Sequence, residues 1–502
     1  MLVRLVSGRV DAASIRRQAT PLAVLIGIAL FTLLPANPQP VQAGTARVIE
    51  PHADSARNDL PALSQIPWPK GTALIPLENV EGVLLIPAAF VGEAGRDTTG
   101  LLALDTGAGY LALDTRLARV LGIADSTEEP AGVGLAARPL PELRIGPIEF
   151  SRVSPVLTFD GEIVRRVTDR PVLGLLGQRP LEDRVVWIDY RERLLVLAPG
   201  GMAAEPDADR DRADAEHPAL APGTERDHTD AEHPALAPDE EAGARLSRRA
   251  LGDALGANAV AVPFRMVGDG KMLVEARVSD PDSSRWSASL TLIVDTGATR
   301  SVLFEEALAT HVGYADQWPS MRGLSAPTLI GTSDARMVRI PRLAVPAVGG
   351  EVTVSEIDVA VLRSELMGVL SRAVGESVDG LLGYNFLKQF RLGIDYAHRV
   401  IWLDAVPPGW DDRPYEYSHV GLQIERWDGA ARVVAVVEHS PADDAGIAAG
   451  DELVAVDGER AGALDIVTLA RRLEGAPRSR ITLTMRRGAR ERTYRLVRRR
   501  LL

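Results

Sequence analysis

The sequence of 502 residues has no cysteine, which excludes disulfides, thiolate metal ligands and a cysteine nucleophile. Basic residues are outnumbered, with 56 Lys and Arg against 68 Asp and Glu, and with a net charge of −12 we expect no nucleic-acid partner. The apolar run from Leu22 to Leu34 is shorter than the roughly 20 residues of a membrane-spanning helix. The hydrophobic content of 46% is nonetheless that of a globular protein, and the length predicts two to four domains.

Residues 1–43 have the pattern of an export signal. Four arginines precede the Leu22–Leu34 run, prolines follow it, and Val41-Gln42-Ala43 offers small residues at a cleavage site. The alternative is a signal-anchor that is not cleaved, which would leave an N-terminal membrane anchor. Both interpretations predict an exported protein, with a periplasmic or extracellular location for the bulk of the chain.

Two stretches differ in composition from a folded domain. Residues 44–72 form a polar, proline-containing lead, and residues 200–247 are rich in Ala, Asp, Glu, Pro and His. Within the second stretch, residues 214–222 recur as residues 230–238. The repeated segment has no aromatic or β-branched residue, so we expect residues 200–247 to be a disordered linker.

On either side of this linker the sequence repeats itself. In each half an apolar segment leads into the same tetrapeptide, Asp105-Thr106-Gly107-Ala108 in the first and Asp295-Thr296-Gly297-Ala298 in the second. A Gly-Leu-Leu-Gly motif follows at residues 174–177 and 380–383, and an Ile-Asp-Tyr motif at residues 188–190 and 394–396. The shared order of the three motifs predicts a duplicated lobe, with copies at residues 73–199 and 248–407.

Each lobe is expected to consist mostly of strands. Apolar segments at 82–87 and 272–276 are bounded by turn residues, and two hairpins are predicted, around turns at 191–193 and 397–399. Helical patterns are short. The aspartates that precede the two hairpin turns, Asp189 and Asp395, are interpreted as turn caps.

These motifs resemble those of retropepsin-like aspartyl proteases, in which each of two lobes supplies one catalytic aspartate. The resemblance implies a mainly β fold of two pepsin/retropepsin-like β-barrel lobes, with Asp105 and Asp295 as the catalytic pair. It implies that Thr106 and Thr296 brace the two catalytic loops, and that Gly107, Ala108, Gly297 and Ala298 complete them. The alternatives are a catalytically silent peptide-binding scaffold and a protease that is active only as a homodimer.

Two carboxyl groups within about 3 Å of each other cannot both ionise, so they share one proton. The ionised group can act as general base on water while the protonated group polarises a peptide carbonyl. This chemistry needs neither a cofactor nor a metal, and we expect neither. Because alanine, which has no hydroxyl, follows each Asp-Thr-Gly, we expect a mildly acidic to neutral pH optimum.

A flap over the catalytic pair is expected in the second lobe, at Thr328-Leu329-Ile330-Gly331-Thr332. The corresponding region of the first lobe, around Gly132-Val133-Gly134, is short. A molecule with a single functional flap would fit this pattern.

After Pro407-Pro408-Gly409 the pattern changes, and residues 411–502 resemble an α+β PDZ domain. Gly421, Leu422, Gln423 and Ile424 stand where that family has its carboxylate-binding loop and groove strand, and Leu469 lies on the helix expected to face the groove. The resemblance implies a peptide ligand whose C-terminal segment adds a strand to the sheet edge. Together the motifs predict an exported aspartic endopeptidase whose PDZ domain recruits protein or peptide substrates.

Overall fold

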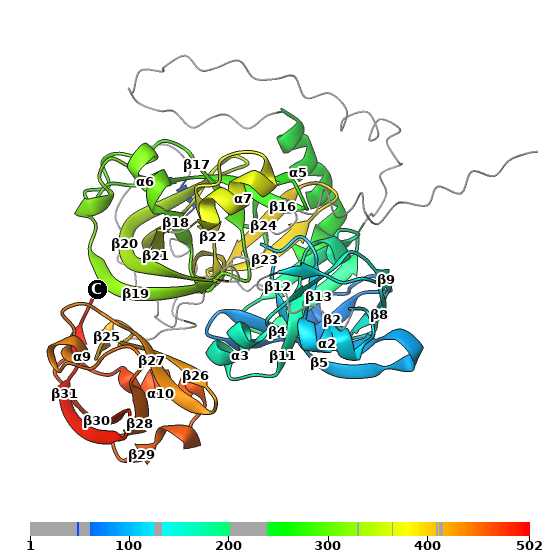
Figure 1. The fold of residues 1–502 in the computed structure, drawn as a ribbon. Coiled ribbons are helices and arrows are strands. Elements are labelled where there is room, and N and C mark those ends of the chain that lie inside the picture. Colours follow the sequence, from blue (N-terminus) through cyan, green and yellow to red (C-terminus); the bar gives the residue numbers. More distant parts are fainter. Residues whose placement is uncertain are drawn as a thin grey trace, which may run out of the picture.

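The structure is a computed structural model that describes residues 48–49, 61–124, 133–200, 238–328, 331–363, 365–407, 410 and 415–502. The expected export signal and residues 201–237 of the expected linker lie outside these ranges. Figure 1 shows two lobes and a C-terminal domain that lies beside both of them. None of the helices in the described ranges is long and apolar enough to cross a membrane.

The first lobe is built on a sheet of nine described strands. Its central strand β5 pairs with β4 on one side and with β11, which runs parallel to it, on the other. Helix α2 (Thr115–Val120) begins at Asp114, whose Oδ1 accepts the main-chain N–H groups of Arg116 and Leu117. Helix α3 (Glu162–Thr168) follows β10. The strands are, across the sheet, β7 (Gly134–Leu135), β10 (Val156–Phe159), β6 (Leu111–Asp114), β11 (Val172–Leu176), β5 (Asp97–Leu104), β4 (Val83–Val91), β8 (Leu140–Ile145) and β9 (Ile148–Val153), with β3 (Glu78–Val80) beside β4.

The second lobe repeats this plan, with β17 and β22 in the places of β5 and β11. Its helices are α6 (Glu305–His311), α7 (Leu366–Val374) and α8 (Tyr384–Leu387). The main difference is the long hairpin of β19 and β20, which reaches from the second lobe toward the first (Figure 1). The strands are β1 (Val48–Ile49), β21 (Gly350–Arg363), β18 (Val302–Phe304), β22 (Gly380–Leu382), β17 (Leu290–Val294), β16 (Lys271–Val278), β20 (Gly331–Ala347) and β19 (Ser320–Thr328), with β15 (Arg265–Val267) beside β16.

A third sheet joins the lobes, because β12 of the first pairs antiparallel with β23 of the second. Trp187 and Gly393 face each other in this pairing, and a Cβ atom at Gly393 would lie 2.7 Å from the buried indole ring of Trp187. Both predicted hairpins are confirmed as β12–β13 and β23–β24. The described strands, in order, are β14 (Val260–Pro263), β24 (Val400–Ala405), β23 (Phe390–Asp395), β12 (Arg184–Asp189), β13 (Leu194–Pro199) and β2 (Ala73–Pro76).

Helix α5 (Pro238–Leu251) corrects one expectation, because it begins inside the stretch assigned to the linker. The hydroxyl of Ser247 donates to Asp395 Oδ2 at 2.6 Å and accepts from Trp402 Nε1 at 2.8 Å, and Ala244 is buried against the second lobe. The prediction of disorder is therefore wrong for residues 238–247. The polar composition of this stretch did not indicate the helix, which packs against the second lobe through the small side chains of Ala244 and Ser247.

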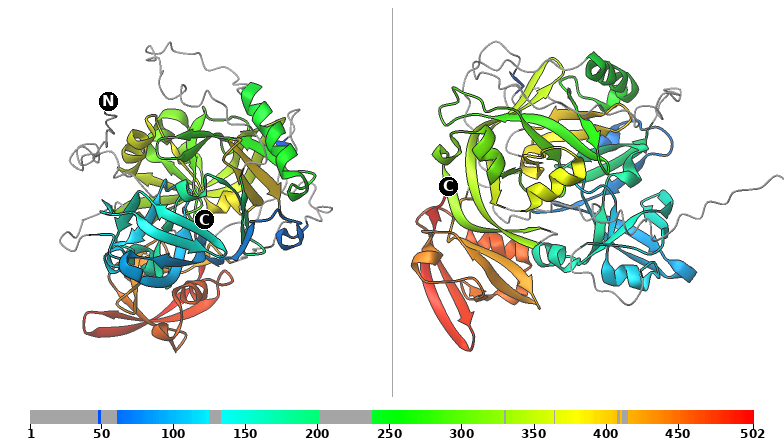
Figure 2. Two further views of the ribbon diagram at one scale, coloured as in Figure 1. Left: turned by 90° about the vertical axis from the view of Figure 1, so that its right-hand side faces the viewer. Right: turned by 45° about the horizontal axis from the view of Figure 1, so that its top comes forward.

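The C-terminal domain has its own hydrophobic core and a sheet of six described strands. Helices α9 (Pro441–Asp444) and α10 (Ile466–Leu473) cover it. Figure 2 shows from two further sides that this domain packs against the lobes. Its strands are β26 (Leu422–Trp427), β27 (Ala430–Val436), β28 (Glu452–Val456), β30 (Arg480–Arg487) and β31 (Arg490–Val497), with β29 (Glu459–Arg460) beside β28 and a separate pair of β25 (Ser418–His419) and β32 (Arg499–Arg500).

Candidate active site

Asp105 and Asp295 each stand directly after the central strand of their lobe, β5 and β17. The main-chain N–H of Asp105 donates to Leu176 O at 3.0 Å, and that of Asp295 donates to Leu382 O at 3.0 Å. The two Leu-Leu-Gly segments thus lie directly beside the two Asp-Thr-Gly loops. The parallel pairing fixes where each strand ends and each loop begins.

The two threonines connect the loops across the lobe interface. Thr106 Oγ1 accepts the N–H of Thr296 at 3.0 Å, and Thr296 Oγ1 accepts the N–H of Thr106 at 3.1 Å. Each hydroxyl also donates to the main chain of the opposite lobe, Thr106 to Val294 O at 3.0 Å and Thr296 to Leu104 O at 3.1 Å. The expected bracing is confirmed, and these four hydrogen bonds hold the two aspartates in register.

Gly107 and Gly297 allow the carboxyl groups to approach the opposite loop. A Cβ atom at Gly107 would lie 2.5 Å from Asp295 Cγ, and one at Gly297 would lie 2.6 Å from Asp105 Cγ. No side chain fits in this space. Both carboxyl groups are fully buried and come together within one chain.

Each carboxyl has one oxygen bound by main-chain donors. Oδ1 of Asp105 accepts the N–H of Ala108 at 3.0 Å, and Oδ1 of Asp295 accepts those of Gly297 and Ala298 at 2.8 and 3.1 Å. The second oxygen, Oδ2, receives no hydrogen bond in either case from a donor group that the structure describes. One oxygen of each group therefore stays available for a shared proton and for chemistry.

Burial controls the ionisation of the pair. It raises the pKa of Asp105 to about 6, against hydrogen bonds that lower it. Burial also raises the pKa of Asp295 well above its usual range, and the nearby charge of Asp105 adds to this effect. Because both pKa values are raised and two such close carboxyls cannot both ionise easily, the pair favours a state that shares one proton.

The surroundings of the two aspartates include three residues that sequence reasoning missed. Gln178, directly after the first Leu-Leu-Gly, is fully buried and donates from Nε2 to Thr106 O. Tyr384 takes the corresponding place in the second lobe, and its hydroxyl accepts from Asn79 Nδ2 at 2.9 Å. The buried Lys271 pairs with Asp269, and its charge lowers the pKa of Asp105. The one signal in the sequence was that the repeated Leu-Leu-Gly is followed by Gln178 in the first lobe and by Tyr384 in the second.

A segment at the start of the C-terminal domain reaches the second Asp-Thr-Gly loop. Arg300, five residues after Asp295, pairs with Glu416, with Nη2 to Oε1 at 3.3 Å, and both side chains are almost fully buried. Because a buried cation needs a partner, this first segment of the C-terminal domain is part of the support of the loop.

The hairpin of β19 and β20 occupies the position expected for the flap, and we call it the flap hairpin. Thr328 pairs with Gly331 at its end, and Thr328 Oγ1 donates to Gly331 O at 2.8 Å. Leu329 and Ile330 lie outside the described residues. In the first lobe Gly132 lies outside them as well, and Gly134 belongs to the short strand β7.

The C-terminal domain holds the flap hairpin through Gln423. The side-chain amide of Gln423 donates to Ser325 O at 2.7 Å and accepts the N–H of Ser325 at 3.0 Å. The N–H of Glu438 donates to Arg322 O at 3.0 Å. Gln423 was expected to bind peptide, but its side chain instead forms hydrogen bonds with the second lobe.

The other residues expected in the peptide groove have mostly structural positions. Gly421 has a φ of +86°, and a Cβ atom there would lie 2.2 Å from the side chain of Ser440. Leu422 and Ile424 are buried in the core of the domain. Leu469 is buried there too, because Ile466, Leu469 and Leu473 form the inner face of α10, so the expectation that Leu469 lines the groove is wrong.

The main-chain edge of β26 remains for strand addition, since β26 is the terminal strand of its sheet. Helices α10 and α3 both pack beside it. Arg426 Nη2 binds Asp169 Oδ2 of the first lobe at 3.3 Å. The first lobe thus lies at one end of the expected groove.

Other polar groups have structural functions. The turn caps are confirmed: Asp189 Oδ1 accepts two main-chain N–H groups after it, and Asp395 Oδ1 accepts that of His398 at 3.2 Å. Among the described residues no group of three His, Asp or Glu side chains is placed to hold a metal ion.

Comparisons with known proteins agree with this geometry. Residues 274–386 match the family described as aspartyl protease, and residues 432–487 match the family described as PDZ domain. A comparison with curated proteins finds no match.

Three solved structures give partial matches. The aspartic proteinase from Irpex lacteus is 12% identical, with 68% of this chain and 100% of that chain covered and a TM-score of 0.35. The PDZ domain of a carboxy-terminal protease from Vibrio cholerae, in complex with a peptide, is 17% identical over 16% of this chain and 94% of that chain, with a TM-score of 0.16.

The photosystem II D1 C-terminal processing protease is 29% identical, with a TM-score of 0.16, and the match covers 17% of this chain and only 24% of that protease. The chain is thus a duplicated, two-lobed protein with two braced Asp-Thr-Gly loops, an aspartyl protease match over residues 274–386 and a C-terminal PDZ domain.

Proposed function

We propose that the protein is an aspartic-type endopeptidase that hydrolyses peptide bonds with a water molecule activated by Asp105 and Asp295. The observation that carries the proposal is the pair of buried carboxyls, each at the end of a braced strand, with the pKa of Asp105 raised to about 6 and that of Asp295 raised well above its usual range. In this state the ionised group can take a proton from water. The protonated group can donate a hydrogen bond to the carbonyl under attack.

Substitution of each aspartate tests the mechanism. Asp105→Asn and Asp295→Asn keep an Oδ1 acceptor for the main-chain donors, so we expect both variants to fold. Each should lower kcat on casein or a peptide library by about 10²–10⁴-fold, as loss of a general acid or base does. Asp316→Asn is the matched control, because that side chain is 90% exposed. Near wild-type turnover by either dyad variant, or wild-type cleavage that pepstatin leaves unchanged, would refute the proposal.

We further propose that the PDZ domain binds peptides and recruits protein substrates. The unpaired edge of β26 supports strand addition by an extended peptide. Calorimetric titration with a peptide that has a free C-terminal carboxylate, and with the same peptide amidated, tests this function. Tighter binding of the free acid is expected, and absence of binding by both peptides would contradict it.

The sequence of residues 1–43 supports export to a periplasmic or extracellular location. A reporter enzyme that is active only outside the cytoplasm, fused after Ala43, tests this proposal. We expect activity with the intact segment and none after deletion of Leu22–Leu34. Equal activity of the two fusions would contradict export.

A further inference from the structure

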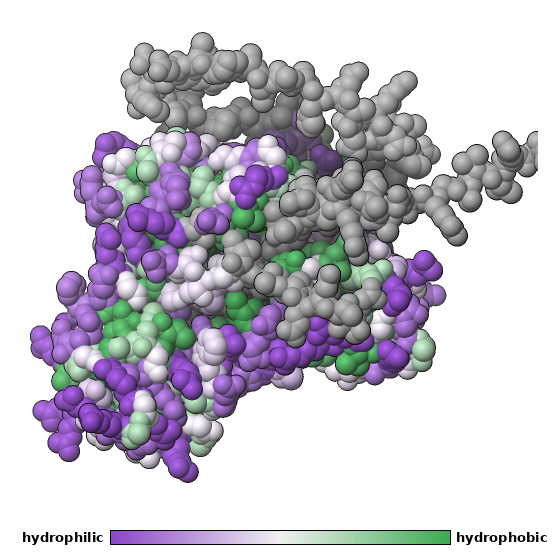
Figure 3. All heavy atoms as spheres, viewed as in Figure 1, coloured by the Kyte–Doolittle hydropathy of each residue, from purple (hydrophilic) through white to green (hydrophobic). Residues whose placement is uncertain are grey.

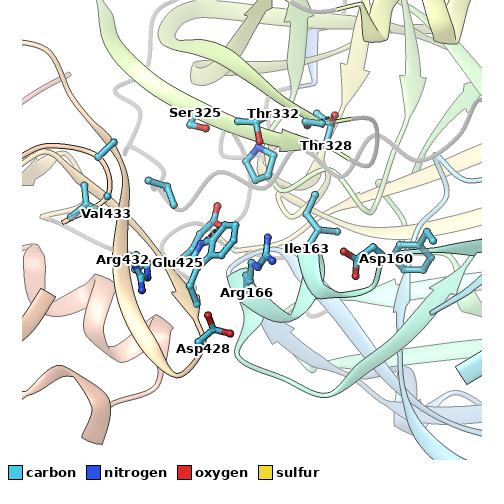
Figure 4. Close-up of a pocket in the computed structure, with 17 residues that line it drawn as sticks. Asp160, Ile163, Arg166, Ser325, Thr328, Thr332, Glu425, Asp428, Arg432 and Val433 are labelled. Carbon is cyan, nitrogen blue, oxygen red and sulfur yellow. Dashed lines mark hydrogen bonds between the residues drawn. The ribbon is translucent and has the colours of Figure 1, made fainter. Parts of the chain in front are cut away.

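A cavity of about 650 Å³ lies where the first lobe, the flap hairpin and the PDZ domain meet. Helix α3 supplies one wall, the end of the flap hairpin a second, and the β26–β27 hairpin of the PDZ domain a third (Figure 4). Helix α3 contributes Ile163 and Arg166, the flap hairpin contributes Thr328 and Thr332, and the β26–β27 hairpin contributes Trp427 and Arg432.

The walls are fixed relative to each other by direct contacts. The guanidinium of Arg166 lies 3.3 Å from the centre of the Trp427 ring, which joins α3 to the PDZ domain. Arg471 of α10 binds Glu81 of the first lobe at 2.8 Å. The two hydrogen bonds between Gln423 and Ser325 hold the flap hairpin to the same domain. The cavity is therefore bounded by three parts of one connected assembly.

The end of the flap hairpin, which is expected to cover the two aspartates, lines the cavity with Thr328 and Thr332. One hydrophobic cluster contains Ala108 and Ala298, which follow the catalytic tripeptides, together with Ala326 of the flap hairpin and Phe159 of the cavity wall. Figure 3 shows that hydrophobic surface on this face gathers where the PDZ domain meets the lobes. A polypeptide that extends past the end of the flap hairpin would therefore meet the cavity.

The lining suits a polypeptide of mixed sequence. It combines the apolar Ile163 with the hydroxyl of Thr332, the exposed cation Arg432, and the exposed anions Asp160 and Asp428. A polyanion or a polycation would meet like charges on one of these walls. The volume corresponds to an edge of about 9 Å, which is the length of about three extended residues at roughly 3.3 Å each.

We propose that this cavity is a substrate subsite, in which the PDZ domain itself helps to hold polypeptide residues that lie beyond the immediate neighbours of the scissile bond. The subsite differs from the expected PDZ groove, which runs between β26 and α10. This inference rests on the proposed protease function.

Filling the cavity tests the proposal. Ala449 lines it from an exposed loop, so Ala449→Trp adds bulk to the cavity and removes no described contact. The neighbouring Ala448 is equally exposed and is not among the lining residues, which makes Ala448→Trp the matched control. Arg432→Ala is a second variant that changes the lining without adding bulk. The substrates are two peptides with the same scissile sequence, one short and one extended by about eight residues at each end.

We expect Ala449→Trp to lower kcat/KM about tenfold for the long peptide and to leave the short peptide unchanged. Arg432→Ala should lower the long-peptide value in the same direction, and Ala448→Trp should change neither. Equal kcat/KM ratios for the two peptides in Ala449→Trp and wild type would overturn the subsite while leaving the protease function intact.

If the wild type cleaves neither peptide, the protease function fails instead. Fluorescence anisotropy of the labelled long peptide then decides the subsite separately. Weaker binding to Ala449→Trp than to Ala448→Trp supports it, and equal binding overturns it.

Discussion

A hydroxyl added beside Asp105 should move one limb of the pH–rate profile, and a hydroxyl added beside Asp295 should move the other. Activity requires one ionised and one protonated group, so the acidic limb follows the lower of the two pKa values and the alkaline limb follows the higher. Burial raises the pKa of Asp105 to about 6, and that of Asp295 is raised well above its usual range. The wild type should therefore have its acidic limb near pH 6.

The size of the shift follows from the strength of one hydrogen bond. Ala108→Ser places a hydroxyl near Asp105, whose Oδ1 accepts the N–H of residue 108 at 3.0 Å. A hydrogen bond to a charged group contributes about 1.5–3 kcal/mol, and about 1.4 kcal/mol corresponds to one pH unit. The bond favours the ionised form and lowers the pKa, so the acidic limb should move down by about one to two pH units.

The assay is kcat/KM for a fluorogenic peptide, measured from pH 3 to pH 10. Ala298→Ser is the matched variant, because it adds the hydroxyl beside Asp295 and should lower mainly the alkaline limb. An acidic limb that stays in place in Ala108→Ser would refute the reasoning. So would a wild-type optimum below pH 4, the range of an unperturbed carboxyl.

Three further substitutions test the packing around the site. Because the native pKa of Asp105 is raised, its ionisation destabilises the folded state as the pH rises from about 4 to about 6. Relative to the wild type, the free energy of unfolding of Asp105→Asn in urea should therefore increase by up to about 3 kcal/mol between pH 4 and pH 7. A stability difference between the two proteins that does not change with pH would contradict this. Glu416→Ala leaves Arg300 buried and without this carboxylate, which should cost about 3–5 kcal/mol, and an unchanged unfolding midpoint would show that the pair is not needed. Gly393→Ala pushes a methyl group into the ring of Trp187 and should cost about 1–3 kcal/mol by the same measurement, against a near-zero effect for the control Gly462→Ala, which has open space around it.

Local motifs allowed much of the site to be predicted from the sequence. The Asp-Thr-Gly tripeptides end apolar strands, and the hairpin aspartates cap their own turns, so each residue's function depends on neighbours in the chain. The bracing by Thr106 and Thr296 was expected from the resemblance to retropepsin-like aspartyl proteases. Short-range chemistry of this kind is visible in sequence spacing.

Contacts between distant segments could not be predicted in this way. Gln423 was interpreted as a peptide-binding residue, and nothing near it in the chain indicates its hydrogen bonds to Ser325. The pairing of Arg300 with Glu416 has the same character, since it joins a catalytic loop to a segment over a hundred residues away. Leu469 is different, because the spacing of Ile466, Leu469 and Leu473 already indicated a core position.

The long flap hairpin affects the direction in which a substrate chain binds. A polypeptide has a direction, and a symmetric site with two identical halves would accept it in either direction equally well. Within the part of the chain that the structure describes, the long flap hairpin belongs to the second lobe, and the C-terminal domain holds it from one side. The two directions of a bound chain therefore have different energies. We expect the protein to distinguish a sequence from its reverse even when the residues at the scissile bond are palindromic.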